Sequence, residues 1–174
     1  VVRQNVHTHK TLTGPGKHVR CVNFSPDGRR LVGGSADEKL WIWETRNWRK
    51  LRTLVGHSGA VNCVVFSPDG LQLASAGMDS KVQLWDSVSG RTVVTIQGHV
   101  NSVWNIAFSP SGNRIASASN RSVKVWDLVT GEEVLDLSEP GGIGSLAFSP
   151  DGRRLATSGG ERTLLWPAQT VEDR

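Results

Sequence analysis

The stretch AVNCVVFSPDGLQLASAGMDSKVQLWD, residues 60–86, contains a turn, FSPDG, that returns throughout the 174-residue chain. The Ser-Pro-Asp-Gly turn, with Ser for Asp in the third copy, begins at Ser25, Ser67, Ser109 and Ser149. A second landmark is the tryptophan at Trp43, Trp85, Trp126 and Trp166. Both landmarks recur every 40 to 42 residues. A period of this size indicates a supersecondary unit that stacks on copies of itself.

Each unit reads as a four-stranded antiparallel meander. Around the quoted turn, the sequence predicts strands at 61–66, 71–76, 81–86 and 91–97. Proline at the second turn position presets φ, and glycine at the fourth accepts a positive φ. The first strand is apolar on both faces, so its sheet must pack between neighbouring sheets.

The unit GHSGAVNCVVFSPDGLQLASAGMDSKVQLWD, residues 56–86, resembles a WD40 repeat, with its Gly-His opening and Trp-Asp close. The third copy, GHVNSVWNIAFSPSGNRIASASNRSVKVWD, shares both marks. The first and fourth copies close with WIWE and LLWP and lack the Gly-His pair. The resemblance implies an all-β fold, a β-propeller with four WD40-type, four-stranded antiparallel blades.

The repeats set the expected blade boundaries at about 5–45, 48–87, 91–128 and 132–168, with a C-terminal tail at 169–174. Residues 5–14 align with KLRTLVGH of the second copy, so we expect them to form the outermost strand of the first of four complete blades. Propellers of this family usually close with seven or eight blades, which implies a partial or half propeller here. Further blades in the same chain, or a homodimer closing an eight-bladed ring, would complete it.

A histidine, a serine and an aspartate in the second copy have the residue types of a hydrolytic triad. The same copy also carries a tryptophan in register. In WD40 proteins these positions form a hydrogen-bonded structural tetrad, which the resemblance carries over to His57, Ser75, Asp79 and Trp85. We therefore expect a structural role for them and no catalysis.

The tetrad is incomplete in the other copies. Its positions hold Gly33, Asp37 and Trp43 in the first copy, His99, Ser117, Asn120 and Trp126 in the third, and Thr157 and Trp166 in the fourth. Terminal repeats often depart from the consensus, so the first and last blades are expected to be less rigid.

Composition excludes several classes of protein. The chain is 37% hydrophobic and 21% charged, as in ordinary soluble domains. No apolar run approaches the roughly 20 residues needed to cross a bilayer. Cys21 and Cys63 occupy equivalent positions, which favours free, buried thiols in a reducing compartment. We expect no metal, no cofactor, no membrane partner and a cytoplasmic location, or a nuclear one in a eukaryote.

The family resemblance implies a rigid platform for proteins or peptides, a non-catalytic interaction scaffold. Its ligands would sit on the loops before the innermost strand and between the second and third strands. The positions carried over to this chain are His18, Arg20, Asn62, Met78, Ser102 and Trp104. Trp104 is the most informative, because Arg20, Asn62 and Gly144 stand in its place elsewhere and the fold does not require an apolar residue there.

Two alternatives stay open. Basic residues fall in loops of the opposite face and suggest a module for RNA or another anionic surface: Arg29, Arg30, Arg46, Arg49, Lys50, Arg153 and Arg154. The net charge of +4 is low for a dedicated nucleic-acid binder, so a nucleic-acid partner is not favoured. The second alternative is a purely structural propeller segment of a larger multidomain protein.

Overall fold

The computed structural model describes residues 11–12, 14, 17–138 and 143–168. These residues form four antiparallel sheets. The strands are β1 Val19–Phe24, β2 Arg30–Ser35, β3 Lys39–Glu44 and β4 Lys50–Val55; β5 Val61–Phe66, β6 Gln72–Gly77, β7 Lys81–Asp86 and β8 Thr92–Gln97; β9 Val103–Phe108, β10 Arg114–Ser119, β11 Ser122–Asp127 and β12 Glu133–Ser138; and β13 Ser145–Phe148, β14 Arg154–Gly159 and β15 Arg162–Pro167. No helix of the described chain is long and apolar enough to cross a membrane.

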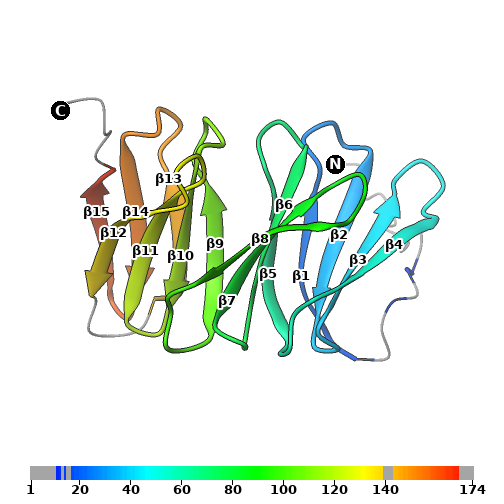
Figure 1. Cartoon of the computed structure of the whole chain (residues 1–174), viewed down its shortest axis with the longest axis horizontal. Helices are drawn as coiled ribbons and strands as arrows, with labels where there is room; N and C mark the ends of the chain where they lie inside the picture. The colour runs from blue at the N-terminus through cyan, green and yellow to red at the C-terminus, as the bar shows by residue number, and fades with distance from the viewer. Residues whose placement is uncertain (1–10, 13, 15–16, 139–142, 169–174) are drawn as a thin grey trace, which may run out of the picture.

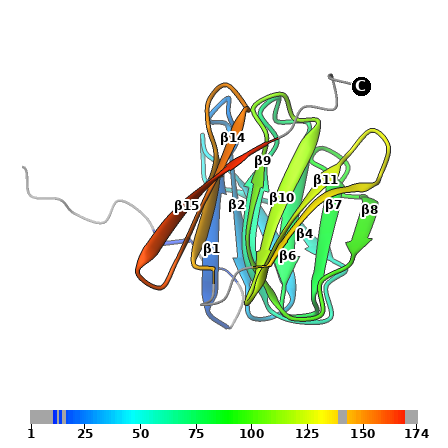
Figure 2. The ribbon, with the colours of Figure 1, turned by 90° about the vertical axis from the view of Figure 1, so that its left-hand side faces the viewer.

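The four sheets stand side by side like blades (Figure 1). Strand order within each sheet follows the chain, and the innermost strands β1, β5, β9 and β13 lie next to one another in succession. Figure 2 looks onto the fourth sheet, and no further described sheet lies in front of it. The sequence-based expectation of an all-β, partial propeller is therefore confirmed.

The meander predicted over 61–97 is the observed second blade, but the blade boundaries taken from the sequence repeats need a correction, because the sheets are offset from those repeats by one strand. Strand β4, at the start of the second repeat, pairs with β3 and completes the first blade. Tight turns such as that closed by the Gly90 N–H on the Asp86 carbonyl (2.8 Å) return the chain along its own sheet. The hydrogen-bonded blades thus span 19–55, 61–97, 103–138 and 145–167.

The expectation of four complete blades is also corrected for the described residues, since the fourth sheet has three strands there. The outermost strand that the sequence placed at 5–14 lies mostly outside the described residues.

The repeated turn has the predicted geometry. Gly70 has a φ of 72°, and its N–H donates to the Ser67 carbonyl at 2.8 Å. The Ser67 hydroxyl donates to Asp69 and accepts from the Gln72 N–H at 2.9 Å, and the bond to Asp69 lowers the pKa of that carboxyl. The glycines of the other three turns also have positive φ: Gly28, Gly112 and Gly152. Glycine takes this conformation without the steric cost that a side chain adds, which explains why glycine recurs at the fourth position of the turn.

The hydrophobic core lies between the blades. Val64 and Phe66 of β5 are 2% and 7% exposed, and they pack in one cluster with Val32 and Leu40 of the first blade. Two further clusters join the second blade to the third and the third to the fourth.

The corresponding side chains on the outer faces of the first and fourth blades are exposed to solvent. Val22 and Phe24 of β1, the counterparts of Val64 and Phe66, are 61% and 55% exposed. At the other end Leu165 is 64% exposed, whereas its counterpart Leu84 is 2% exposed. Burial of these positions is therefore set by the neighbouring blade and not by the sheet itself.

This difference gives a matched pair of substitutions. Phe66→Ala should lower the free energy of unfolding by about 3–5 kcal/mol, because it opens a cavity between two blades. Phe24→Ala, at the same place in its repeat, should lower it by less than about 1 kcal/mol, because its ring is already half in water. Urea unfolding of both variants, at concentrations below those at which the chain associates, checks this. Equal losses would contradict the assignment of the core to the blade interfaces.

Candidate binding face and the network that supports it

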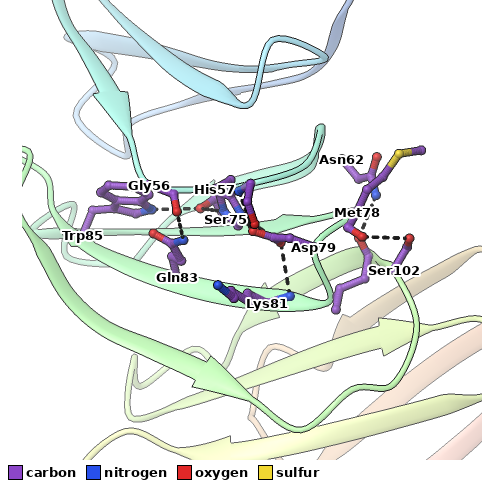
Figure 3. Close-up of polar contacts among 12 residues, drawn as sticks. Gly56, His57, Asn62, Ser75, Met78, Asp79, Lys81, Gln83, Trp85 and Ser102 are labelled. Atoms are coloured by element: carbon purple, nitrogen blue, oxygen red, sulfur yellow. Dashed lines mark hydrogen bonds and ion pairs between the residues drawn. The ribbon is translucent and has the colours of Figure 1, made fainter.

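A chain of hydrogen bonds runs through the second blade (Figure 3). The Trp85 Nε1–H donates to the Ser75 hydroxyl at 2.8 Å, and Ser75 Oγ lies 2.7 Å from His57 Nε2. His57 Nδ1 lies 3.0 Å from both oxygens of Asp79. The Ser58 N–H also donates to Asp79, at 3.0 Å. The four residues expected to form a tetrad thus lie in one network.

The charges in this network follow from burial. Burial lowers the pKa of His57, against the opposing effect of the Asp79 carboxylate, so the imidazole is neutral at pH 7. Burial raises the pKa of Asp79, but the Ser58 N–H and His57 outweigh this effect and the pKa is lowered. A neutral imidazole with its hydrogen on Nδ1 can donate to Asp79 and accept from Ser75 through Nε2.

The network joins two loops around a buried serine. Ser75 is fully buried, and its hydroxyl already accepts from Trp85 and faces the His57 nitrogen. Asp79 ties the loop around His57 to the turn between β6 and β7, where the Met78 N–H also donates to the Ala60 carbonyl at 2.9 Å. The turn that carries Met78 is therefore held to the loop that precedes β5 and Asn62.

The third blade keeps part of this arrangement but differs at the acidic position. Ser117 Oγ lies 2.7 Å from His99 Nε2 and accepts from the Trp126 Nε1–H at 2.9 Å. The expectation that Asn120 takes the aspartate's place is wrong. Ser122 Oγ stands 3.2 Å from His99 Nδ1, because the turn is one residue shorter than in the second blade. In the fourth blade, Trp166 donates to Thr157 at 3.0 Å.

The first blade has no serine at the position of Ser75. An added Cβ on Gly33 would meet the six-membered ring of Trp43 at 3.2 Å, so this glycine accommodates the indole. Asp37 accepts only a long bond, 3.3 Å, from the Lys39 N–H within the described residues.

Hydrogen bonds connect the predicted binding residues across three blades. The Arg20 guanidinium donates to the Asn62 side-chain oxygen at 2.9 Å, and the Asn62 amide nitrogen donates to the Val103 carbonyl at 2.9 Å. The Ser102 hydroxyl donates to the Met78 carbonyl at 3.3 Å (Figure 3). These bonds orient the side chains at the starts of β1, β5 and β9.

Trp104 lies on the same side of the molecule and is 39% exposed. Its Nε1–H donates to the Asn120 side-chain oxygen at 2.7 Å, so the ring is oriented although it is open to solvent. Met78 is 40% exposed, and His18 is also exposed and precedes β1. We call Arg20, Asn62, Met78, Ser102, Trp104 and Asn120 the inner rim.

Asn120 is the rim residue that sequence reasoning assigned to the wrong role. The missing residue in the turn between β10 and β11 was the available signal, because it displaces Asn120 from the position equivalent to Asp79. No group of three or more side chains suited to hold a metal occurs in the described part of the chain.

The basic residues of the opposite face are not all free. The Arg30 guanidinium donates to the Ser87 carbonyl at 2.9 Å, to the Ser87 hydroxyl at 3.0 Å and to the Gly70 carbonyl at 3.0 Å. It also lies 5.2 Å from the centre of the Phe66 ring. Arg30 therefore joins the first blade to the second, which removes it from a phosphate-binding surface.

The fold defines a β-propeller segment, and the second blade of the described chain holds the complete buried network. The chain matches the family described as WD domain, G-beta repeat, over residues 6–44, 48–86, 90–127 and 131–166. It therefore belongs to the WD40 repeat family, whose members are generally protein-interaction scaffolds and typically non-catalytic. A search of curated proteins found no match.

The network predicts unequal effects of two aspartate substitutions. Asp79→Ala should lower the free energy of unfolding by about 1–3 kcal/mol, because His57 and the Ser58 N–H lose their acceptor. Asp37→Ala, at the same place in the first blade, should lower it by less than about 1 kcal/mol, since the described contacts of Asp37 are weaker. Thermal unfolding compares the two variants. A larger loss for Asp37→Ala would contradict the structural role given to the network.

Proposed function

We propose that this chain is a non-catalytic protein-interaction scaffold whose inner rim binds a short acidic peptide. The observation that carries the proposal is Trp104, a large ring that is part exposed and yet fixed by a hydrogen bond to Asn120. An aromatic side chain held in one orientation loses little entropy on binding, and tryptophan and arginine are enriched among the residues that dominate binding energy.

The neighbouring rim residues suit such a ligand. Arg20 supplies a positive charge and Asn62 supplies an amide. Met78 supplies a polarizable thioether on the second blade, next to the third blade that carries Trp104. The repeat leaves these positions free to vary, since Arg20, Asn62 and Trp104 are equivalent residues of successive copies. Their chemistry is therefore available for recognition.

Binding of RNA or another anionic surface is the weaker proposal. Exposed arginines such as Arg29 and Arg153 on the opposite face support it, whereas the three hydrogen bonds of Arg30 to the second blade count against it.

Trp104→Ala tests the proposed rim. Peptides selected on the wild-type chain from a random display library should be enriched in Asp and Glu. Trp104→Ala should weaken their binding by about 2 kcal/mol or more and lower stability much less.

Arg20→Ala should mainly slow association and reduce its salt dependence. Titration calorimetry measures the binding free energy, and thermal unfolding of the same samples measures the stability.

Val129→Ala is the matched control, because this exposed valine lies on a turn away from the rim. If melting collapses together with binding in Trp104→Ala, the ring belongs to the core and the rim assignment is wrong.

The exposed apolar faces of the first and fourth blades suggest that each of them packs against a further blade. Each inner blade interface joins a face like that of Val22 and Phe24 to a face like that of Leu165. Additional blades would bury both ends, whether they come from the same chain or from a second copy related by a two-fold axis.

The chain by itself should therefore associate through its first and fourth blades. Light scattering at micromolar to millimolar concentration should show a mass above that of the 18.9 kDa chain. Phe24→Asp should restore the monomer, because it places a charge on the bare face. A folded wild-type monomer throughout this range would count against completion by a second copy.

A further inference from the structure

The repeated turns of neighbouring blades touch one another in the same way at each blade interface of the described chain. The turn proline of one blade lies against the turn glycine of the next blade. A Cβ added to that glycine would meet the proline Cδ at 3.4 Å for Pro26 and Gly70, at 3.7 Å for Pro68 and Gly112, and at 3.6 Å for Pro110 and Gly152. Two members of this set have no such neighbour, since Pro150 and Gly28 are exposed and no described atom lies within 4 Å of a Cβ added to Gly28. They lie on the fourth and first blades, at opposite ends of the row (Figure 1).

The interface between the first and second blades has a second contact, made by Arg30. Its guanidinium donates to the Ser87 carbonyl at 2.9 Å, to the Ser87 hydroxyl at 3.0 Å and to the Gly70 carbonyl at 3.0 Å. The Ser87 hydroxyl itself donates to the Gly70 carbonyl at 2.7 Å, which fixes these acceptors side by side. The guanidinium also lies 5.2 Å from the centre of the Phe66 ring. Several acceptors in a fixed arrangement suit the rigid fork of donors that arginine presents.

The outer side of the first blade presents the same set of acceptors. The Thr45 hydroxyl donates to the Gly28 carbonyl at 2.7 Å, as Ser87 does to Gly70. Phe24, the counterpart of the ring that lies beside Arg30, is 55% exposed. We call Phe24, Gly28 and Thr45 the outer acceptor site. It has the parts that receive Arg30 in the second blade.

The fourth blade presents the matching donor. Arg154 is the first residue of β14, as Arg30 is the first residue of β2. Its side chain is exposed, and no hydrogen bond or ion pair joins its guanidinium to another residue within 17–138 or 143–168. Arg154 is therefore available to a blade that packs against the fourth one.

The pairing of an arginine with a hydroxyl group is selective among the blades. Gln72 stands at the arginine position of the second blade, and Leu128 and Ala168 stand at the hydroxyl position of the third and fourth blades. Within the described chain, the interface of the first two blades is thus the one that joins an arginine to a hydroxyl. The outer faces of the fourth and first blades carry the same combination in Arg154 and Thr45.

The apolar part of the fourth blade's outer face also fits a blade. Ala156 and Leu165 pair across β14 and β15, as Ala74 and Leu84 pair across β6 and β7. Ala74 and Leu84 are buried against the third blade, whereas Leu165 is 64% exposed. This face therefore has small and apolar side chains where the second blade receives its neighbour.

We propose that a second copy of this chain docks its fourth blade on the outer face of the first blade, in the register of the interface between the first two blades. Pro150 of one copy then packs on Gly28 of the other. Arg154 donates to the Gly28 carbonyl and to the carbonyl and hydroxyl of Thr45, beside the Phe24 ring. The partner is a second copy because one chain carries both halves of the contact at opposite ends of its row of blades.

A two-fold axis forms this contact twice and gives a ring of eight blades from two chains. The inference rests on the proposed packing of the exposed first and fourth blades against further blades, and not on the peptide proposed for the inner rim.

Sedimentation equilibrium tests the contact through the dissociation constant of the pair. Arg154→Ala should weaken association about tenfold at each interface, and hence about a hundredfold for a ring with two interfaces, because each loses hydrogen bonds to a charged group. Arg153→Ala is the matched control, since it removes the same charge from the neighbouring position. Leu71, the counterpart of Arg153 in a blade covered on both faces, is 61% exposed, so this position stays in solvent. Arg153→Ala and Trp104→Ala should therefore leave the dissociation constant nearly unchanged.

A mixing experiment tests which faces meet. Phe24→Asp blocks the first blade and Leu165→Asp blocks the fourth, and both side chains are largely exposed, so the fold is kept. Each variant alone should be a monomer. An equal mixture should form a one-to-one pair, through the first blade of the Leu165→Asp chain and the fourth blade of the Phe24→Asp chain. A pair formed by Leu165→Asp alone would show that first blade meets first blade, and it would overturn the proposal.

The remaining outcomes separate this contact from the association on which it rests. A folded wild-type monomer up to millimolar concentration would overturn both. A wild-type pair that Arg154→Ala and Arg153→Ala weaken equally would leave the association in place and overturn the contact proposed for Arg154. A mixture of the two blocked variants that stays monomeric, while the wild type associates, would overturn the docking of the fourth blade on the first.

Discussion

The stacking of one sheet on the next is the constraint on which this structure depends. Val64 and Phe66 are buried only because the first blade covers them, while Val22 and Phe24, at the same positions, are largely exposed. A four-stranded sheet with two apolar faces gains most of its stabilisation from its neighbours. The turns, the hydrogen-bonded network and the inner rim all depend on blades that are stabilised by packing against their neighbours.

Local chemistry made much of the fold predictable. The Ser-Pro-Asp-Gly turn determines its own geometry, as the positive φ of Gly70 shows, and the strands beside it end close to where the sequence places them. The meander predicted over 61–97 groups the fourth strand correctly, whereas the blade boundaries taken from the repeats assign that strand to the next blade. A sequence period defines the repeat but leaves open which strands pair.

The geometry of the proposed binding side was predictable only in part. The family pattern brings Arg20, Asn62 and Trp104 to successive inner strands, and the structure adds the bonds that fix them. The shorter turn signals that Asn120 is out of register with Asp79, but it does not show that the Asn120 amide faces Trp104 or that Ser122 faces His99. Such exchanges of partner arise from side-chain geometry that a linear pattern does not carry.

Amide hydrogen exchange of the Phe24→Asp variant, in which the chain is expected to be monomeric, tests the central claim most directly. If blades stabilise one another face to face, the amides of β6, β7, β10 and β11 should exchange most slowly, since sheets cover both faces of these blades. The amides of β14 and β15 should exchange faster, because the described structure covers one face of the fourth blade only. Equal protection in all four blades would show that each sheet is stable without its neighbours, and it would contradict the account.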